Sequence, residues 1–352
     1  MQRPVMNPMF LHEGEVTTPS KPTLWARLRS LPHWIAKALL CDICFWQADR
    51  LKIEDGSAIK RIAMGMAYRL LFVPVILAGG VVALVWLGTH PPTAASALDP
   101  LTHGIHYDPV SFVSADGALL EAWFVPVVDS KVVLDQKDQV LRAKYPAVVL
   151  AHDYSASRHQ MLPLIQPLHK AGYAVLAVAL RGGNSIGAKG SAFGLREHAD
   201  VEAAVELLRR RPGIDPDRIA VLGIGTGANA ALLAAERDPK IAAVILDHPV
   251  TNIDQLIADR ISPPQPWLQW LRPLCKWTFE LGYGVDSEEM DLRRHQATLA
   301  ARPVLVFDTP AEAARCFREG GLKQCQAFLA QHLPQPQSEN PPAANVDLKE
   351  LK

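Results

Sequence analysis

The chain has 352 residues, of which 49% are hydrophobic and 20% are charged, so it can bury a sizeable core and is not globally disordered. Lysine plus arginine and aspartate plus glutamate both number 36, and this balance gives no reason to expect nucleic acid as a partner. The 5 cysteines are too few for a dense disulfide framework.

An apolar stretch near the start of the chain, Leu24 to Trp46, is interrupted by charged residues and is not expected to span a membrane. Its tryptophans, leucines and cations predict a helix lying in the membrane interface, within a cytoplasmic segment 1–65. A helix that faces a protein partner is the alternative. Cys41 and Cys44 form an isolated C-x-x-C pair. Without a second pair, this is weak evidence for a metal or redox role, and we interpret both cysteines as small apolar residues of this helix.

The run from Leu70 to Gly88, LLFVPVILAGGVVALVWLG, contains no charged and no strongly polar side chain. At about 1.5 Å per residue, a helix of this length crosses a hydrocarbon core of roughly 30 Å. The run begins too deep in the chain for an ordinary cleavable signal. We therefore predict a transmembrane helix within residues 66–90, with a buried core helix as the alternative.

Flanking charge predicts the orientation of this helix. Five cations precede it, and no lysine or arginine occurs from Thr89 to Tyr107; the five are Arg50, Lys52, Lys60, Arg61 and Arg69. Positive charge stays on the cytoplasmic side. We expect a single-pass protein of the cell (inner) membrane, with a cytoplasmic N-terminus and an extracytoplasmic, periplasmic large domain. Its expected partners are the lipid bilayer and another membrane or extracytoplasmic protein.

The large domain follows a linker, 91–106, and begins with two strand-like runs around a turn at Ala115–Gly117, which predicts a β-hairpin over 110–126. From residue 146, strands and helices alternate, and the strands are apolar runs without polar alternation. This pattern predicts a parallel sheet covered by helices on both faces. Residues 335–352 are predicted to be a disordered tail. The expected strands are 147–152, 173–180, 218–223, 240–247 and 302–308, and the expected helices are 161–171, 197–211 and 228–237.

Four blocks of the sequence resemble, in order, successive blocks of the α/β-hydrolase superfamily, in particular of bacterial serine esterases and dienelactone-hydrolase-like enzymes. The blocks are PAVVLAHDYSASRHQM, GYAVLAVALRGGNSIG, SAFGLREHADVEAAVELLRRRPGIDPDRIAVLGIGTGANAALLA and IAAVILDHPV. The resemblance covers about residues 107–334. It implies an α/β-hydrolase fold, preceded here by one transmembrane helix. Function follows from a fold only by analogy.

The resemblance also locates the nucleophile, which in this fold lies at the centre of G-x-S-x-G on a strained turn between a strand and a helix. The corresponding segment is Gly223-Ile224-Gly225-Thr226-Gly227, so Gly225 takes the position of the serine. Using Thr226 instead would place Ile224 and Ala228 at positions that need glycine. A phosphate-binding loop is disfavoured because the G-x-G-x-x-G spacing is not met.

The rest of the expected triad is also incomplete. Aligned on the family pattern, Glu312 takes the acid position. The triad histidine should follow a further strand, but no histidine occurs from Ala313 to Gly321, before a predicted last helix at 322–333. The last strand and its loop are therefore expected to be shortened or missing. The H-G pair that serves the oxyanion hole is His152-Asp153, which lacks the glycine.

Polar residues gather at the expected carboxyl ends of the strands, where open α/β sheets bind ligands. We expect seven of them to line the cleft: His152, Asp153, Tyr154, Thr226, Asp247, His248 and Asp308. The histidines and carboxylates could bind a divalent metal, but their spacing forms no compact motif. Cap and turn residues left from a hydrolase ancestor are the preferred interpretation, so no metal and no cofactor is expected.

Residues 251–301 lie where such folds insert a lid, and they carry an aromatic stripe at helical spacing: Trp267, Trp270, Leu274, Trp277 and Leu281. The stripe is expected to pack over the sheet, with contact to a membrane surface or a partner as the alternative. Further along, Cys316 and Cys325 are close enough in sequence to pair if their compartment is oxidising.

Two functions from different classes follow. The first is a membrane-anchored, catalytically inactive hydrolase-like protein that acts as a binding or scaffold protein, because the serine and the histidine are both missing. The alternative is an active membrane-bound esterase or peptidase-like member of the serine hydrolases with a non-standard site.

Overall fold

The computed structural model describes residues 58–92, 98–127, 144–182, 190–290, 292–308 and 315–335. Four predictions lie outside the described residues: the interfacial helix over 24–46, the Cys41/Cys44 pair, the acid position Glu312 and the tail beyond residue 335. The chain divides into two compact units, Met1–Leu77 and Ala78–Lys352.

Helix α4, Ala58–Thr89, contains the predicted membrane span. Its stretch Phe72–Thr89 has a mean hydropathy of 2.2, and only 22% of that stretch is buried. The predicted span is therefore a helix that is long and apolar enough to cross a bilayer. The crossing itself and its direction stay predictions.

A 3-10 turn, η2 (Pro100–His103), forms within the segment expected to be a plain linker, because Asp99 caps it by accepting a hydrogen bond from the Thr102 N–H. The predicted hairpin is confirmed: β1 (Asp108–Val113) and β2 (Leu119–Val125) pair antiparallel. Gly117 takes a φ of 81° in the connecting turn, as the sequence indicated.

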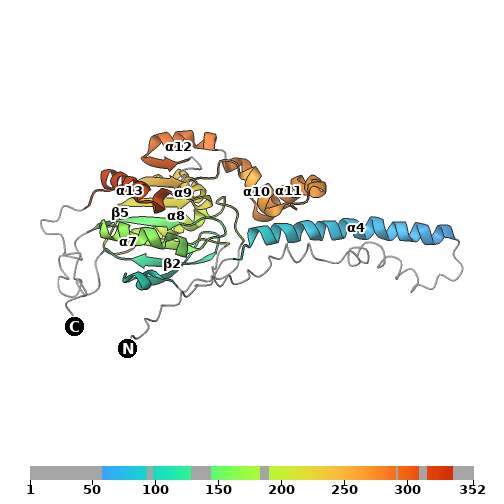
Figure 1. Cartoon of the computed structure of the whole chain (residues 1–352), viewed down its shortest axis with the longest axis horizontal. Helices are drawn as coiled ribbons and strands as arrows, with labels where there is room; N and C mark the ends of the chain where they lie inside the picture. Colours follow the sequence, from blue (N-terminus) through green and yellow to red (C-terminus); the bar gives the residue numbers. More distant parts are fainter. Residues whose placement is uncertain are drawn as a thin grey trace, which may run out of the picture. The chain divides into compact units, whose positions relative to one another are not determined.

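Seven strands form one sheet in the order β1-β2-β4-β3-β5-β6-β7. The hairpin joins the rest through antiparallel pairing of β2 with β4, and every pair from β4 to β7 is parallel. The other strands are β3 (Tyr145–Ala151), β4 (Ala174–Ala179), β5 (Ile214–Ile224), β6 (Ala243–Asp247) and β7 (Val304–Phe307). The predicted mostly parallel sheet is confirmed, and its layers are visible in Figure 1.

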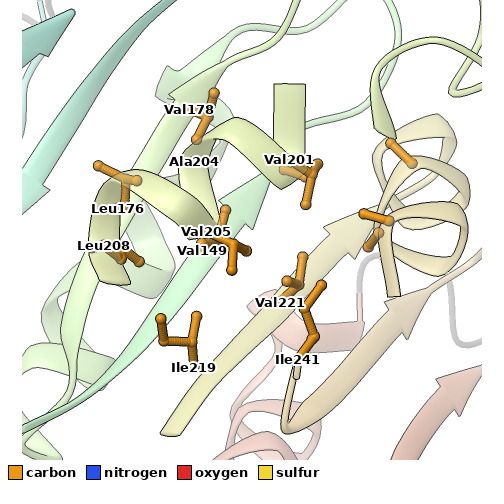
Figure 2. Packing of buried hydrophobic residues seen from close by; sticks show 14 of the residues in the cluster. Val149, Leu176, Val178, Val201, Ala204, Val205, Leu208, Ile219, Val221 and Ile241 are labelled. Carbon is orange, nitrogen blue, oxygen red and sulfur yellow. The ribbon is translucent and has the colours of Figure 1, made fainter. Parts of the chain in front are cut away.

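Helices cover both faces of the sheet, which explains why its strands are apolar without alternation. Side chains such as Val149 and Leu176 meet α8 (His198–Arg209) and α9 (Thr226–Arg237) on one face (Figure 2). Their neighbours Val148 and Val175 point to the other face, towards α7 (Leu162–Lys170) and α13 (Glu319–His332), with the turn η3 (Arg158–Met161) leading into α7. Successive residues of each strand thus serve opposite layers of core.

A helical insertion separates β6 from β7. It comprises α10 (Ile253–Ile261), η4 (Pro266–Leu271), α11 (Arg272–Tyr283), η5 (Ser287–Met290), η6 (Leu292–His295) and α12 (Gln296–Ala301). The expectation that its aromatic stripe packs over the sheet is wrong, because Trp267, Trp270, Trp277 and Leu281 are exposed. The buried face of α11 is instead formed by Cys275 and Phe279, which lie on the opposite side of the helix.

After β7 the chain passes through η8 (Arg315–Phe317) into α13, the helix predicted at 322–333. Within the described parts of this stretch, residues 308 and 315–318, no strand follows β7. Because residues 309–314 lie outside the described part of the chain, a shortened or missing final strand and histidine-bearing loop stay a prediction.

Candidate functional site

A sharp turn joins β5 to α9, and Gly225 lies at its apex with φ 56° and ψ −120°. Such a conformation is strained for any residue with a side chain. A Cβ built on Gly223 would lie less than 3.0 Å from the Gly227 backbone, and one built on Gly227 would come equally close to the backbone of Ala151 and His152. The turn is thus a nucleophile elbow centred on Gly225, and Thr226 is the first residue of α9.

The side chain of Asp153 occupies the space above the elbow. Its Oδ1 accepts hydrogen bonds from the N–H of Thr226 at 2.8 Å, the N–H of Tyr154 at 2.7 Å and the hydroxyl of Thr226 at 3.1 Å. In this fold the oxyanion hole is built from the N–H that follows the nucleophile and an N–H from the loop after β3. Asp153 therefore places its own carboxylate where a substrate oxyanion would be held.

Asp153 also occupies the space that a nucleophilic side chain at position 225 would need. A Cβ built on Gly225 would lie less than 3.0 Å from both carboxylate oxygens of Asp153. The carboxylate lies at the N-terminus of α9, where the helix dipole and free N–H groups favour a negative charge. The Asp153 N–H donates to Oε1 of Gln160 at 2.9 Å and fixes the backbone of this loop.

His152 borders the same space but is engaged at both ring nitrogens. The N–H of Leu180 donates to its Nε2 at 3.0 Å, so Nδ1 carries the proton and donates to the Asp153 carbonyl at 2.8 Å. Burial lowers the pKa of His152 below its usual value. The ring is therefore neutral and structural, and it has no nitrogen left to act as a general base.

The three remaining residues predicted for the cleft do not join this group. The Asp247 side chain is fully buried and accepts a hydrogen bond from the Cys316 N–H at 3.0 Å; only its backbone oxygen reaches the elbow, at the Gly225 N–H. His248 is half-buried with φ 52°, and Asp308 is exposed beyond β7. Across the described residues, no group of three His, Cys, Asp or Glu is placed to hold a metal ion.

Sequence reasoning missed a buried carboxylate in the wall of the cleft. Glu197 accepts hydrogen bonds from the Ser191 hydroxyl at 2.6 Å and from the N–H groups of Ala192 and Gly194, both at 2.9 Å. Burial raises the pKa of Glu197, and the hydrogen bond from Ser191 opposes that rise. Because these donors all come from the loop before α8, Glu197 holds that loop in place rather than facing a reactant.

The end of α4 contacts two of the loops that line the cleft, which the sequence did not reveal. The Tyr154 hydroxyl donates to the carbonyl of Gly88, and the Ser191 N–H donates to the carbonyl of Thr89 at 2.8 Å. Burial raises the pKa of Tyr154 to about 12, so its phenol stays protonated. The loop that carries Asp153 is thus tied directly to the last turn of the apolar helix.

Comparison with known proteins agrees with this geometry. The family model described as "Serine aminopeptidase, S33" matches residues 143–327. The chain belongs to this family, within the α/β hydrolases. Two uncharacterized proteins of Mycobacterium tuberculosis, from strains CDC 1551 / Oshkosh and ATCC 25618 / H37Rv, are each 28% identical over 209 residues, or 56% of this chain and 66% of theirs. The chain thus matches slightly less than two thirds of the length of these relatives.

Two further comparisons concern a fungal enzyme and an archaeal fold. The polyketide transferase ATR5 of Stachybotrys chlorohalonatus is 30% identical over 146 residues, which are 41% of this chain and 44% of that protein. Two crystal forms of the Pyrococcus furiosus esterase Pf2001 superpose with TM-scores of 0.51 and 0.52 at 23% and 21% identity, covering 69% and 70% of this chain and 99% and 98% of theirs. These structures show that the fold is shared.

Within the S33 family, this chain departs from the serine chemistry of the family name at one decisive point. The elbow that should present a serine presents Gly225, and the strand–turn–helix geometry around it is retained. The sequence also lacks a histidine between Asp308 and the last helix. The fold has therefore kept the scaffold of the site while its chemical groups have changed.

Proposed function

We propose that this S33-family chain is a membrane-anchored α/β-hydrolase-like protein that lacks serine hydrolase activity and acts as a binding or scaffold protein. The observation that carries the proposal is the carboxylate of Asp153 in the oxyanion hole above Gly225. Removing the serine of a catalytic triad costs about six orders of magnitude in rate on its own. Here the oxyanion hole is filled as well.

The absence of a suitable base supports the same conclusion. A hydroxyl is a weak nucleophile near neutral pH and needs a base within hydrogen-bond reach. His152, whose backbone lies against the elbow at Gly227, uses both ring nitrogens in structural hydrogen bonds. Residues 309–318, where the fold would supply the triad histidine, contain none.

Membrane anchoring rests on α4. The stretch Phe72–Thr89 is apolar, and most of its side chains are not covered by protein. Exposed apolar surface of this extent is unfavourable in water and favourable in lipid. Together with the cations that precede this apolar stretch, this supports a single-pass protein of the inner membrane, with the N-terminus cytoplasmic and the hydrolase-like domain outside the cytoplasm. Its partners are the bilayer and another membrane or extracytoplasmic protein.

The catalytic half of the proposal is tested on the full chain purified in detergent. We expect no turnover of a short-chain activated ester above the buffer rate and no labelling by a fluorophosphonate probe. A related active serine esterase, assayed in the same detergent, controls for inhibition by the micelle. Turnover or labelling of the wild-type chain would overturn the proposal.

The binding half is tested in intact membranes. A tagged full chain is crosslinked and purified under denaturing conditions, with a tagged, unrelated single-pass protein as the control. We expect one defined crosslinked species that the control does not give. A chain that stays uncrosslinked at every crosslinker length would contradict a scaffold role.

One observation favours the alternative, an active hydrolase with a non-standard site. The hydroxyl of Thr226 donates to the carboxylate of Asp153 at 3.1 Å, which pairs a hydroxyl with a base at the elbow. Thr226 is the first residue of α9 and is almost fully buried, and its oxygen already accepts a hydrogen bond from the Tyr154 N–H at 2.7 Å. If wild-type turnover is found, its loss in Thr226→Val but not in Ser155→Ala would assign it to this pair.

A further inference from the structure

An exposed apolar surface covers one side of the helical insertion. Its members are four large side chains with exposed fractions of 72%, 62%, 59% and 67%, namely Trp267, Trp270, Trp277 and Leu281, and we call it the tryptophan surface. They lie on η4 and α11 and recur at helical spacing. A cluster of exposed tryptophans is uncommon on a protein surface and marks a site of contact.

The tryptophan surface is not needed to hold α11 on the protein, because the opposite side of the helix does so. Cys275 and Phe279 are fully buried, and the Phe279 ring packs against Phe193 at 5.4 Å and against Tyr283 at 5.1 Å between ring centroids. Lys276 adds an ion pair to Asp254 of α10 at 2.7 Å. The helix therefore has two apolar sides, of which only one is used by the fold.

The same insertion holds the last turn of α4. Gly88 packs so closely against α10 that an added Cβ would lie less than 3.0 Å from the Arg260 carbonyl oxygen and from the Ile261 side chain. At the end of α11, the Tyr283 hydroxyl lies near the side chain of Thr89, the last residue of α4. Figure 1 shows α10 and α11 beside this end of α4. The tryptophan surface is thus fixed in position relative to the point where the apolar helix ends.

Near its end, α4 also exposes large apolar side chains, as the tryptophan surface does. Val82 and Trp86 are each 57% exposed, whereas Val81 and Val85, on the adjacent side of the helix, are buried. Trp86 lies one turn before the end of the helix, where an interfacial tryptophan belongs if α4 leaves the bilayer at Thr89.

We propose that the tryptophan surface docks on the lipid bilayer beside the point where α4 emerges, as a second membrane contact of the domain. This inference rests on the proposed anchoring by α4. Tryptophan prefers the membrane–water boundary, where its ring is buried among acyl chains and its N–H reaches polar headgroups. Arg272, exposed at the start of α11, adds a cation for anionic headgroups.

We favour a bilayer over a protein partner because α4, as a membrane anchor, already holds the domain next to the bilayer. A surface held next to the membrane by a covalent tether needs little intrinsic affinity, since its effective concentration at the bilayer is high. Docking would hold the hydrolase-like domain in one orientation on the membrane. It would also explain why four large apolar side chains have been left uncovered next to a membrane helix.

The test uses the full chain reconstituted in vesicles of phosphatidylcholine and phosphatidylglycerol. A genetically encoded fluorescent amino acid replaces one residue at a time: Trp270 in the tryptophan surface, Val82 in α4, or the exposed Lys323 on α13 as the control. Lipids with brominated acyl chains quench fluorophores that contact them. We expect strong quenching at positions 270 and 82 and none at 323.

The positions separate the two proposals. Quenching at 82 without quenching at 270 would overturn the docking and leave the anchor intact; no quenching at 82 would overturn both. Energy transfer between chains labelled at position 270 without lipid quenching would identify a second copy of the chain, not the bilayer, as the occupant. As a further check, Trp267→Gln/Trp270→Gln/Trp277→Gln should abolish quenching of a probe at Leu281, whereas Val113→Gln, at an exposed site on β1, should not.

Discussion

The carboxylate of Asp153 lies directly over Gly225, at the place where a nucleophilic serine and the oxyanion of its substrate would meet. Two separate departures from the serine hydrolase pattern therefore meet at the same point. One removes the attacking atom, and the other fills the hole that would stabilise the developing charge. A single substitution cannot reverse both.

Restoring the serine alone is predicted to fail. In Gly225→Ser the new side chain would collide with Asp153, and the strained backbone would gain a Cβ. The double variant Gly225→Ser/Asp153→Gly clears the oxyanion hole, but the serine still lacks a base. We expect neither protein to turn over a short-chain activated ester or to react with a fluorophosphonate.

Folding controls accompany this experiment, since an unfolded protein is also inactive. The wild type and both variants are compared by thermal unfolding of the full chain in detergent before the assays. Robust labelling of the folded double variant would reveal a working base, and the interpretation of the C-terminal region would then be wrong.

Removing the Asp153 carboxylate should destabilise the fold. In Asp153→Ala the N–H of Thr226 loses its acceptor at Oδ1, which costs about 1–3 kcal/mol of unfolding free energy, whereas the N–H of Tyr154 keeps the Thr226 hydroxyl oxygen as an acceptor. Asp153→Asn keeps an acceptor oxygen and should lose less. Thermal or denaturant unfolding in detergent measures both, and Asp217→Ala, at an exposed site on β5, is the matched control. An unchanged stability in Asp153→Ala would contradict the hydrogen bonds described here.

Local pattern was enough to predict the sheet, the hairpin and the elbow. The turn at Gly225 follows from glycines that backbone crowding requires at Gly223 and Gly227, and such a requirement is written in consecutive residues. Local pattern does not predict that the Asp153 side chain lies over the elbow, because 73 positions separate Asp153 from Thr226. The loss of the H-G glycine was visible in the sequence, but the place taken by the new side chain was not.

The aromatic stripe shows a second limit. Helical spacing places Trp270, Trp277 and Leu281 on one side of a helix, but it does not say whether that side faces the core. Cys275 and Phe279 offered a second apolar side, and the fold buries that one. Contacts between the Tyr154 hydroxyl and Gly88, 66 positions apart, also required the tertiary structure.

Stability should fall as the pH is lowered through neutrality because of His152. Burial depresses its pKa in the folded protein, so the unfolded chain binds the proton more readily. The contribution of His152 is therefore present above its unfolded pKa of about 6.5 and is lost as the pH falls towards the folded pKa, by at most about 1.4 kcal/mol per pH unit.

The measurement is the unfolding free energy of the full chain in detergent between neutral and mildly acidic pH. Because other groups titrate too, the wild-type slope is compared with that of His152→Asn, which cannot take up the proton. We expect a flatter slope in this variant and an unchanged slope in His103→Asn, at an exposed site in η2. Parallel slopes for wild type and His152→Asn would show that His152 does not titrate as its burial requires.

The orientation of α4 can be read with a reporter. Arg61 and Arg69 precede the apolar stretch, and no lysine or arginine occurs from Thr89 to Tyr107, so the C-terminus should lie outside the cytoplasm. A C-terminal alkaline phosphatase fusion should be active and a C-terminal green fluorescent protein fusion dark. Moving cations, by Arg61→Gln/Arg69→Gln with Thr102→Lys/His106→Lys, should weaken this asymmetry. A dark phosphatase fusion with a fluorescent counterpart would reverse the topology.

A disulfide between Cys316 and Cys325 is the last prediction, and it depends on that topology. The two Sγ atoms lie 3.3 Å apart, and both side chains are fully buried. Forming the bond removes two protons and two electrons, which a thiol oxidant of the extracytoplasmic space must accept. The hydrogen bond with Cys325, together with burial, raises the pKa of Cys316 well above its usual range, so the thiolate that would react is scarce in the folded protein. Oxidation should therefore occur during folding.

The test is mass spectrometry of the chain isolated from membranes, denatured and alkylated without reduction. It should yield the linked 316–325 peptide, whereas Cys275, buried elsewhere, should be alkylated. Alkylation of all three cysteines in a chain whose C-terminus lies outside the cytoplasm would show that the pair stays reduced.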